Sequence, residues 1–407
     1  MLRRLHDTFD RHRHAGTRIG VALLAMAFGL LVVGGTIRVL RAADRDPPPA
    51  PASGSASLRW TATLDTAAAG LAIEEGRLYV TGGQLTVFPV SCITTPEGCP
   101  PRWRGIVPDG PLSVPTVRDG RVYVGSSSGQ VYAFPDVCEG DGCPPEWVGI
   151  AGEGRVSQPA ANFDLVYVTS DELYAFPAGC ATEDLPCPPA WSADVPGRPA
   201  AGPPALGEGL VVVASASTRG GVVAYPAVCG EGCQPVWTAR TDGPATSVAI
   251  GEGYAYTVAR GQLMAFPLSC TGRCQAEWRA PFLPGAPFAT GAASAPAVVD
   301  GAVLVGDVEG RLWAFRSSCG DTRCEPLASY DVATSALHTP AVEGDQVVVT
   351  AMDGVVVRVR MDCAADDDEC EAVRVRITGS RALAPAVIAS DSVIVGAKDG
   401  SLEAFQL

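Results

Sequence analysis

A repeat runs along most of this 407-residue chain, and it limits the possible folds more than any other feature. Its clearest copy begins at Trp103 and contains the segments LSVPTV, RVYVGS and QVYAFP, separated by the turns Asp119-Gly120 and Ser128-Gly129. The tryptophans that begin successive copies lie 41 to 46 residues apart: Trp60, Trp103, Trp147, Trp191, Trp237 and Trp278. Self-similarity at this period is typical of propellers and solenoids.

Each copy holds four short runs rich in valine, tyrosine and phenylalanine, with Asp-Gly or Ser-Gly turns that suit tight β-hairpins. An aromatic residue ends the third run of most copies: Phe88, Phe134, Phe176, Tyr225, Phe266, Phe315 and Phe405. A degenerate copy near the C-terminus has Val359 in the aromatic position and Leu327 in the tryptophan position. Four antiparallel strands per copy form one propeller blade, and residues 59–407 have room for eight blades.

The two ends of the repeat region are expected to pair. Trp60 begins a fourth strand that has no third strand before it, and residues 401–407 form a third strand with no fourth. Pairing of strand 59–64 with strand 401–406 would complete the eighth blade and remove two exposed β-edges. The sequence therefore predicts an all-β fold, an eight-bladed propeller of four-stranded antiparallel blades closed by its terminal strands.

These segments resemble the pyrroloquinoline-quinone-like propeller repeat, in which a valine- and tyrosine-rich strand, a DG turn and a docking tryptophan recur. The match covers nearly everything after residue 58. The resemblance implies the fold and leaves the chemistry open, because the repeat serves both dehydrogenases and non-catalytic scaffolds. In architecture the chain is similar to the propeller lipoprotein of the outer-membrane assembly machine, which binds other proteins. It differs in having no cysteine for a lipid anchor before Cys92.

An uncharged segment of 19 residues, from Ile19 to Ile37, is long enough to cross a bilayer as a helix. Five arginines precede it and three follow it: Arg3, Arg4, Arg11, Arg13, Arg18, Arg38, Arg41 and Arg45. This excess favours a cytoplasmic N-terminus. We therefore predict a cytoplasmic tail (1–18), a transmembrane signal-anchor helix (19–40), a proline- and alanine-rich spacer (41–58) and an extracytoplasmic propeller at the cell membrane. A cleaved signal peptide is the alternative.

Fourteen cysteines fall into seven close pairs, each between the third strand and the tryptophan strand of its copy. The pairs are Cys92 with Cys99, Cys138 with Cys143, Cys180 with Cys187, Cys229 with Cys233, Cys270 with Cys274, Cys319 with Cys324 and Cys363 with Cys370. Zinc would need four converging ligands, whereas successive pairs belong to different blades. We therefore predict seven disulfides, which persist in an oxidising compartment, as the predicted topology requires.

Reactive groups are scarce in the predicted propeller. His338 is its only histidine, and a packed or channel-lining role is expected for it rather than catalysis. The acidic run 366–369 lacks the spacing of a calcium loop, so a solvated hairpin is expected. Quinoprotein dehydrogenases of this repeat family carry adjacent cysteines over the cofactor, and this sequence has no Cys-Cys pair. We expect no catalytic residues, no cofactor and no metal.

Two departures from the repeat are candidates for partner binding. The longest loop, Ala280 to Ser294, carries Phe282 and Phe288, and the lengthened turn Ser215 to Gly221 carries Arg219. In a propeller these two connections lie on the same face, so both would project together. We predict that Phe282, Phe288 and Arg219 bind a partner, since aromatic residues and arginine dominate interface energetics. The alternative is that the two phenylalanines only cover a neighbouring blade.

The net charge of −14 is concentrated after residue 45, because the N-terminal region is basic. An acidic body repels phosphate backbones, so nucleic acid is not an expected partner. The leading prediction is a non-enzymatic scaffold that binds proteins in the cell envelope. A quinone-dependent oxidoreductase and a receptor for wall polysaccharide are the alternatives.

Peptide mapping of the exported protein tests the cysteine assignment. Because each pair lies within one hairpin, we expect all fourteen cysteines to be oxidised, each to its neighbour in the sequence. Free thiols in several copies, or bound zinc, would contradict both the pairing and the predicted compartment.

Overall fold

The computed structural model describes residues 57–406 except 95–98, 109, 181–185, 219, 231, 283–293, 300, 345, 361–372 and 378–380. The predicted tail and transmembrane helix, and nearly all of the spacer, lie outside these residues. In the part of the chain that the structure describes, no helix is both long and apolar enough to cross a membrane.

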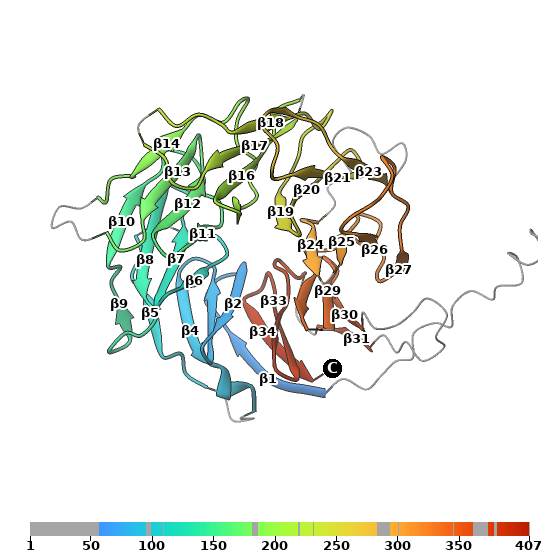
Figure 1. The fold of residues 1–407 in the computed structure, drawn as a ribbon. Helices are drawn as coiled ribbons and strands as arrows, with labels where there is room; N and C mark the ends of the chain where they lie inside the picture. The colour runs from blue at the N-terminus through green and yellow to red at the C-terminus, as the bar shows by residue number, and fades with distance from the viewer. Residues whose placement is uncertain are drawn as a thin grey trace, which may run out of the picture. The chain divides into compact units, whose positions relative to one another are not determined.

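Eight antiparallel sheets are arranged in a ring, as Figure 1 shows, which confirms the predicted all-β, eight-bladed propeller. Each blade has four antiparallel strands, A to D, from the axis outward, and a short parallel strand from the next blade extends two of the sheets to five strands. The first four blades consist of β2 (Gly70–Glu74), β3 (Arg77–Thr81), β4 (Leu85–Pro89) and β5 (Trp103–Gly105); β6 (Thr116–Arg118), β7 (Arg121–Gly125), β8 (Gln130–Pro135) and β10 (Trp147–Ile150); β11 (Ala160–Ala161), β12 (Leu165–Thr169), β13 (Leu173–Pro177) and β14 (Trp191–Ala193); and β15 (Ala205–Gly207), β16 (Leu210–Ser215), β17 (Gly221–Pro226) and β18 (Trp237–Ala239).

The last four blades follow the same order, and the eighth takes its outer strand from the start of the propeller. They consist of β19 (Val248–Gly251), β20 (Tyr254–Ala259), β21 (Gln262–Pro267) and β23 (Trp278–Pro281); β24 (Ala297–Val299), β25 (Ala302–Gly306), β26 (Arg311–Arg316) and β27 (Ala328–Asp331); β28 (Ala341–Glu343), β29 (Gln346–Thr350), β30 (Val355–Arg360) and β31 (Val373–Arg376); and β32 (Val387–Ala389), β33 (Ser392–Gly396), β34 (Ser401–Gln406) and β1 (Ser57–Thr63).

The ring is closed by β1, which pairs antiparallel with β34 and so joins the first strand of the propeller to the last. Trp60 lies opposite Ala404 and Thr63 opposite Ser401. The innermost strands contact one another around the whole ring, including β2 of the first blade with β32 of the eighth. The predicted pairing of the terminal strands is therefore confirmed.

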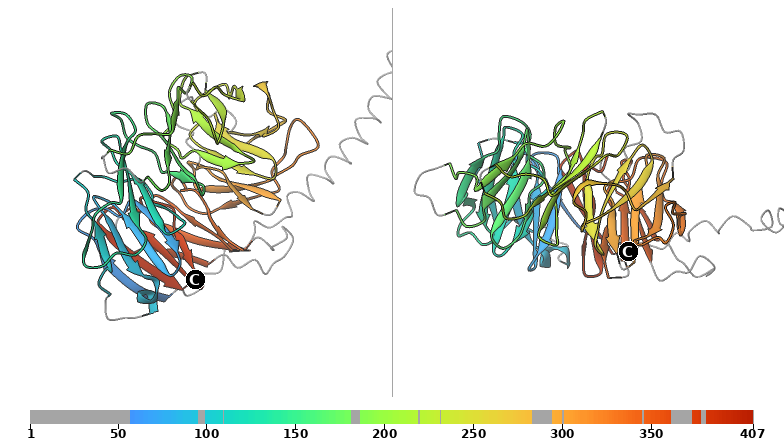
Figure 2. Two further views of the ribbon diagram at one scale, coloured as in Figure 1. Left: turned by 60° about the vertical axis from the view of Figure 1, so that its left-hand side comes forward. Right: turned by 45° about the horizontal axis from the view of Figure 1, so that its top comes forward.

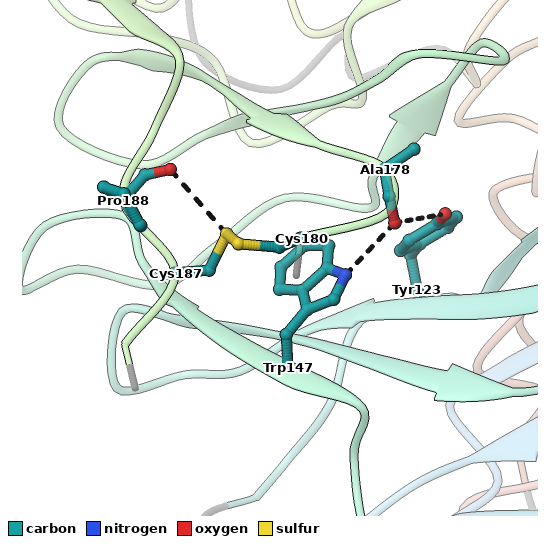
Figure 3. Close-up of a disulfide and its surroundings, with 6 residues drawn as sticks. All are labelled: Tyr123, Trp147, Ala178, Cys180, Cys187 and Pro188. Carbon is teal, nitrogen blue, oxygen red and sulfur yellow. Dashed lines mark hydrogen bonds between the residues drawn. A yellow bond between two sulfur atoms is a disulfide. The ribbon is translucent and has the colours of Figure 1, made fainter. Parts of the chain in front are cut away.

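The outer tryptophan of a blade packs against the aromatic residue that ends strand C of the next blade. In blade 2, Trp147 stacks on Phe176 of blade 3 with ring centroids 6.0 Å apart. Its indole nitrogen donates to the carbonyl of Ala178, which also accepts from the Tyr123 hydroxyl (Figure 3). A Cβ on Gly149 would lie 2.6 Å from the Phe176 ring, so the space beside the tryptophan requires glycine. The residues that set the repeat in the sequence are thus the residues that join the blades.

The same packing recurs around the ring, and the aromatic residues involved are buried. The equivalent pairs are Trp60 with Phe88, Trp103 with Phe134 and Trp237 with Phe266. Burying an aromatic side chain contributes roughly 1.5–3 kcal/mol, so these contacts contribute substantially to blade association.

Six of the seven predicted disulfides are confirmed, each within the hairpin between strands C and D of one blade. The bonded pairs are Cys92 with Cys99, Cys138 with Cys143, Cys180 with Cys187, Cys229 with Cys233, Cys270 with Cys274 and Cys319 with Cys324. The seventh predicted pair, Cys363 with Cys370, lies outside the described residues and stays a prediction. The second cysteine is the buried member of every pair that the structure describes except the first, in which Cys92 is buried and Cys99 is half-buried. The disulfides therefore tie the hairpins to the packed body of the blades.

The hairpins that carry the disulfides also reach back to the preceding blade. Two short strands within them, β9 (Gly142–Cys143) and β22 (Gly272–Cys274), pair parallel with β5 and β18, the outer strands of blades 1 and 4. In blade 1 the hairpin contains a 3-10 helix, η1 (Val90–Thr94), which contacts β1. The hairpins therefore cover β-edges that would otherwise be open.

Removal of residues 401–407 tests the closure. The deletion takes away β34 and leaves β1 and β33 without partners, so we expect aggregation and loss of a single cooperative unfolding transition. Calorimetry and light scattering on the full chain and on the deletion measure both effects. Deletion of Leu407 alone, which lies beyond β34, is the matched control and should unfold like the parent. A 401–407 deletion that stays monomeric and equally stable would contradict closure by this pairing.

Candidate functional site

The propeller has two faces with different loops. Because neighbouring strands are antiparallel, the A–B turns and the C–D hairpins lie on one face, and the B–C turns and D–A loops lie on the other; Figure 2 gives two further views of the blades. We call the first the disulfide face and the second the B–C face. The chain enters the propeller on the disulfide face, since Ser57 pairs with Gln406 at the end of strand C.

Acidic residues occupy many turns of the disulfide face. Glu75, Asp119, Glu208 and Glu252 have φ values of 46° to 51°, and each precedes a glycine that also has positive φ. Two successive positive φ angles are the geometry of a type I′ hairpin turn. The four turns place carboxylates at the ends of A–B hairpins in blades 1, 2, 4 and 5.

Two adjoining cavities of about 690 and 720 Å³ lie at blades 4 and 5, lined mainly by loops of the B–C face and also by residues 273–275 of the C–D hairpin of blade 5. They share Thr218, Arg240, Asp242 and Arg279, so we treat them as one arginine groove. The remaining lining comes from segments of both blades: Pro196, Gly197, Ser215, Ser217, Gly220, Gly221, Val223, Thr238, Ala239, Thr241, Ala259, Arg260, Gln262, Arg273, Cys274 and Gln275.

Close backbone packing fixes one wall of the groove. The B–C turn of blade 4 lies against the loop that follows β18, and a Cβ on Gly220 would lie 1.6 Å from the Gly243 carbonyl oxygen. Gly220 also has a φ of 62°, which favours glycine. The Ala245 amide donates to the Ser215 carbonyl at 3.2 Å and links the same two segments. The groove is therefore built on segments that leave little room for rearrangement.

Four arginines line the groove: Arg240, Arg260, Arg273 and Arg279. Asp242 is the only acidic residue among the described lining residues, and it forms an ion pair with Arg279 at 3.2 Å. In the part of the chain that the structure describes, Arg240 and Arg273 are exposed and form no ion pair. The groove is thus a cationic site on a protein whose net charge is −14.

Arg260 is held in an unusual position for a long side chain. It occupies the first place of the β20–β21 turn with a φ of 50°, followed by Gly261 with a φ of 68°. Asparagine, aspartate or glycine is the usual residue at such a position. The stem of Arg260 packs against Gly243, where an added Cβ would lie 2.8 Å from Cγ. Both the turn and this contact direct Arg260 along the groove wall.

The structure corrects the prediction for Phe282. This side chain is only 5% exposed and packs against Trp313 and Phe315 of blade 6, with ring centroids 5.9 and 6.0 Å away. It is therefore not available to a partner, and the alternative in which it covers the neighbouring blade holds for this residue. Phe288 lies outside the described residues, so its role stays a prediction.

Arg219 also lies outside the described residues, but the residues on either side of it, Thr218 and Gly220, both line the groove. The lengthened turn that contains it therefore lies beside the groove, and the binding role of Arg219 stays a prediction. The four groove arginines were missed. One signal was present in the sequence, because arginines outnumber acidic residues between positions 240 and 279 while the rest of the propeller is strongly acidic.

His338 lies in the D–A loop before β28, and its Nε2 is 3.3 Å from the Ala382 carbonyl oxygen of blade 8. Burial lowers the pKa of His338, so the ring favours its neutral form. Among the described residues, no three histidine, cysteine, aspartate or glutamate side chains are grouped as metal ligands. Residues 366–369, the acidic run considered for calcium, lie outside the described residues. The absence of an active site stays a prediction.

Comparisons with known proteins agree on the fold. A family model described as outer membrane protein assembly factor BamB matches residues 49–141 and 189–407. The structure is similar to that of BamB from Moraxella catarrhalis, with a TM-score of 0.61 and 16% identity, over 87% of this chain and 98% of that one. A search of curated proteins found no match to the sequence.

Two further solved structures are similar. One is the computationally designed Ika8 protein, with a TM-score of 0.65 and 14% identity, over 85% of this chain and 98% of that one. The other is Saccharomyces cerevisiae Sqt1, with a TM-score of 0.68 and 10% identity, over 87% of this chain and 99% of that one. At these identities the likeness shows the fold alone.

Substitution of Phe282 by serine tests the correction. Because the ring fills the junction between blades 5 and 6, we expect the free energy of unfolding to fall by about 3 kcal/mol, with a lower melting temperature. Phe163, which is 76% exposed in an A–B turn, is the matched control. The Phe163→Ser variant should have a free energy of unfolding within about 0.5 kcal/mol of that of the parent. Equal melting of the two variants would restore Phe282 as a candidate contact residue.

Proposed function

This chain belongs to the family described as outer membrane protein assembly factor BamB, and from that premise we propose that it is a membrane-anchored, extracytoplasmic scaffold that binds proteins and has no catalytic role. The arginine groove carries this proposal. It is a rigid, concave, charged site of the kind that binding proteins present, on a propeller face built from variable loops.

The anchor and compartment rest on the sequence. The uncharged segment 19–37 and its flanking arginines support a single helix with the propeller outside the cytoplasm. The six disulfides of the described residues support the same compartment, because such bonds are rare in reducing ones.

The path of the chain supports presentation of the B–C face to a partner. The propeller begins on the disulfide face, at Ser57, whereas most of the loops that line the arginine groove are B–C turns and D–A loops. A spacer of 18 residues precedes the propeller in this topology, and proline-rich chains extend by roughly 3 Å per residue. The groove is therefore free to meet a second envelope protein.

Site-specific photocrosslinking in the native cell tests the proposal. A crosslinking amino acid at Gln275, which is exposed and lines the groove, should give a discrete adduct with an envelope protein that mass spectrometry identifies. The same amino acid at Glu139, exposed in the C–D hairpin of blade 2 and outside the groove, is the control and should give little or none. Adducts at Glu139 alone, or no protein adduct at either position, would contradict a scaffold that binds through this groove.

A further inference from the structure

We infer that the arginine groove binds an acidic polypeptide segment, in which several aspartate or glutamate residues follow one another along the two adjoining cavities. This inference rests on the proposed scaffold function and names the chemistry of the partner. It is based on the four arginines that line the groove and on the ion pair that one of them, Arg279, forms with Asp242.

The groove presents guanidinium groups to solvent. Arg240 and Arg273 are exposed and form no ion pair among the described residues. A guanidinium is a planar group with several N–H donors, and its geometry matches a carboxylate, which accepts two of those donors side by side. Two arginines at one concave site that form no ion pair with any described acidic residue therefore favour an anionic ligand.

The pair formed by Arg279 and Asp242 shows that a carboxylate fits this groove. The Arg279 Nη1 atom lies 3.2 Å from the Asp242 Oδ2 atom, and both side chains line both cavities. Both are substantially solvent-exposed, so a ligand can reach them. Asp242 thus occupies one of the carboxylate positions of the site and competes with an incoming carboxylate for Arg279.

The size of the groove favours a polypeptide over a single small anion. Each cavity, at about 690 and 720 Å³, is in the range of sites that hold whole organic molecules. Four arginines spread over both cavities would contact several carboxylates of one extended segment. Nucleic acid also carries repeated anions, but its long phosphate backbone would meet the acidic surface of a body with net charge near −19, since residues 1–45 contribute eight arginines against three aspartates.

Binding of a fluorescein-labelled decaglutamate peptide to the full chain in detergent tests the inference. Wild-type protein should bind the peptide, and affinity should fall as salt is raised from about 50 to about 500 mM because the contacts are ionic. Arg240→Ala combined with Arg273→Ala should weaken binding at least about tenfold, since two charge-assisted pairs are lost. Asp242→Asn should strengthen binding several-fold, because it releases Arg279 and removes a like charge.

Two controls separate the groove from overall charge and from folding. Arg118→Ala combined with Arg316→Ala removes the same number of exposed arginines on the disulfide side of blades 2 and 6 and should leave binding unchanged. Melting temperature reports whether any variant has lost its fold. The opposite signs expected for the arginine pair and for Asp242→Asn would not arise from a purely structural role of these residues.

Three results would overturn the inference: no binding by the wild type, equal weakening by the groove and control pairs, or no gain from Asp242→Asn. These outcomes differ from a failure of the proposed function. Crosslinks at Gln275 without decaglutamate binding would keep the scaffold and reject the acidic partner. Decaglutamate binding without protein crosslinks in the cell would keep the chemistry of the groove and reject the scaffold.

Discussion

The pairing of β1 with β34 is the interaction on which the rest of the propeller depends. Blades are joined to their neighbours by the tryptophan of the outer strand, which in blades 1, 2, 4 and 8 packs against an aromatic residue of the following blade. A row of blades joined in this way would end in two open β-edges unless the first strand, β1, paired with the last, β34. Trp60 on β1 then packs against Phe88 of blade 1, so the strand that completes blade 8 also joins it to the first blade.

Much of the fold was predictable because its determinants are local and repeated. Tryptophan, the strand-ending aromatic and the cysteine pair recur at fixed places in most copies, and the tryptophan makes the same contact with the aromatic residue of the next blade in four blades. Phe282 was not predictable in this way, since its spacing does not reveal that the ring turns back onto Trp313 and Phe315. Likewise, the coverage of β5 and β18 by hairpins of the next blade depends on how blades sit together.

The candidate site was predictable only in part, for a related reason. The lengthened turn at 215–221 stood out as a departure from the repeat. By contrast, Arg240, Arg260, Arg273 and Arg279 lie in segments of ordinary length, up to 39 positions apart in the sequence. They meet because two neighbouring blades bring a D–A loop, a B–C turn and a hairpin to one groove. The pattern of one sequence does not show which side chains of neighbouring blades lie close together.

The disulfides and the groove, which the sequence presents as separate features, are physically joined at blade 4. Strand β22 carries Arg273, pairs parallel with β18 and ends at Cys274, which forms a disulfide with Cys270. Cys274 and Arg273 both line the groove, and Arg273 lies opposite Thr238 of β18. The disulfide restricts the hairpin that holds one of the four arginines, so it limits the conformations that this side chain can adopt before a ligand arrives. Preorganisation of this kind lowers the entropic cost of binding. An oxidising compartment therefore supports the proposed binding site as well as the fold.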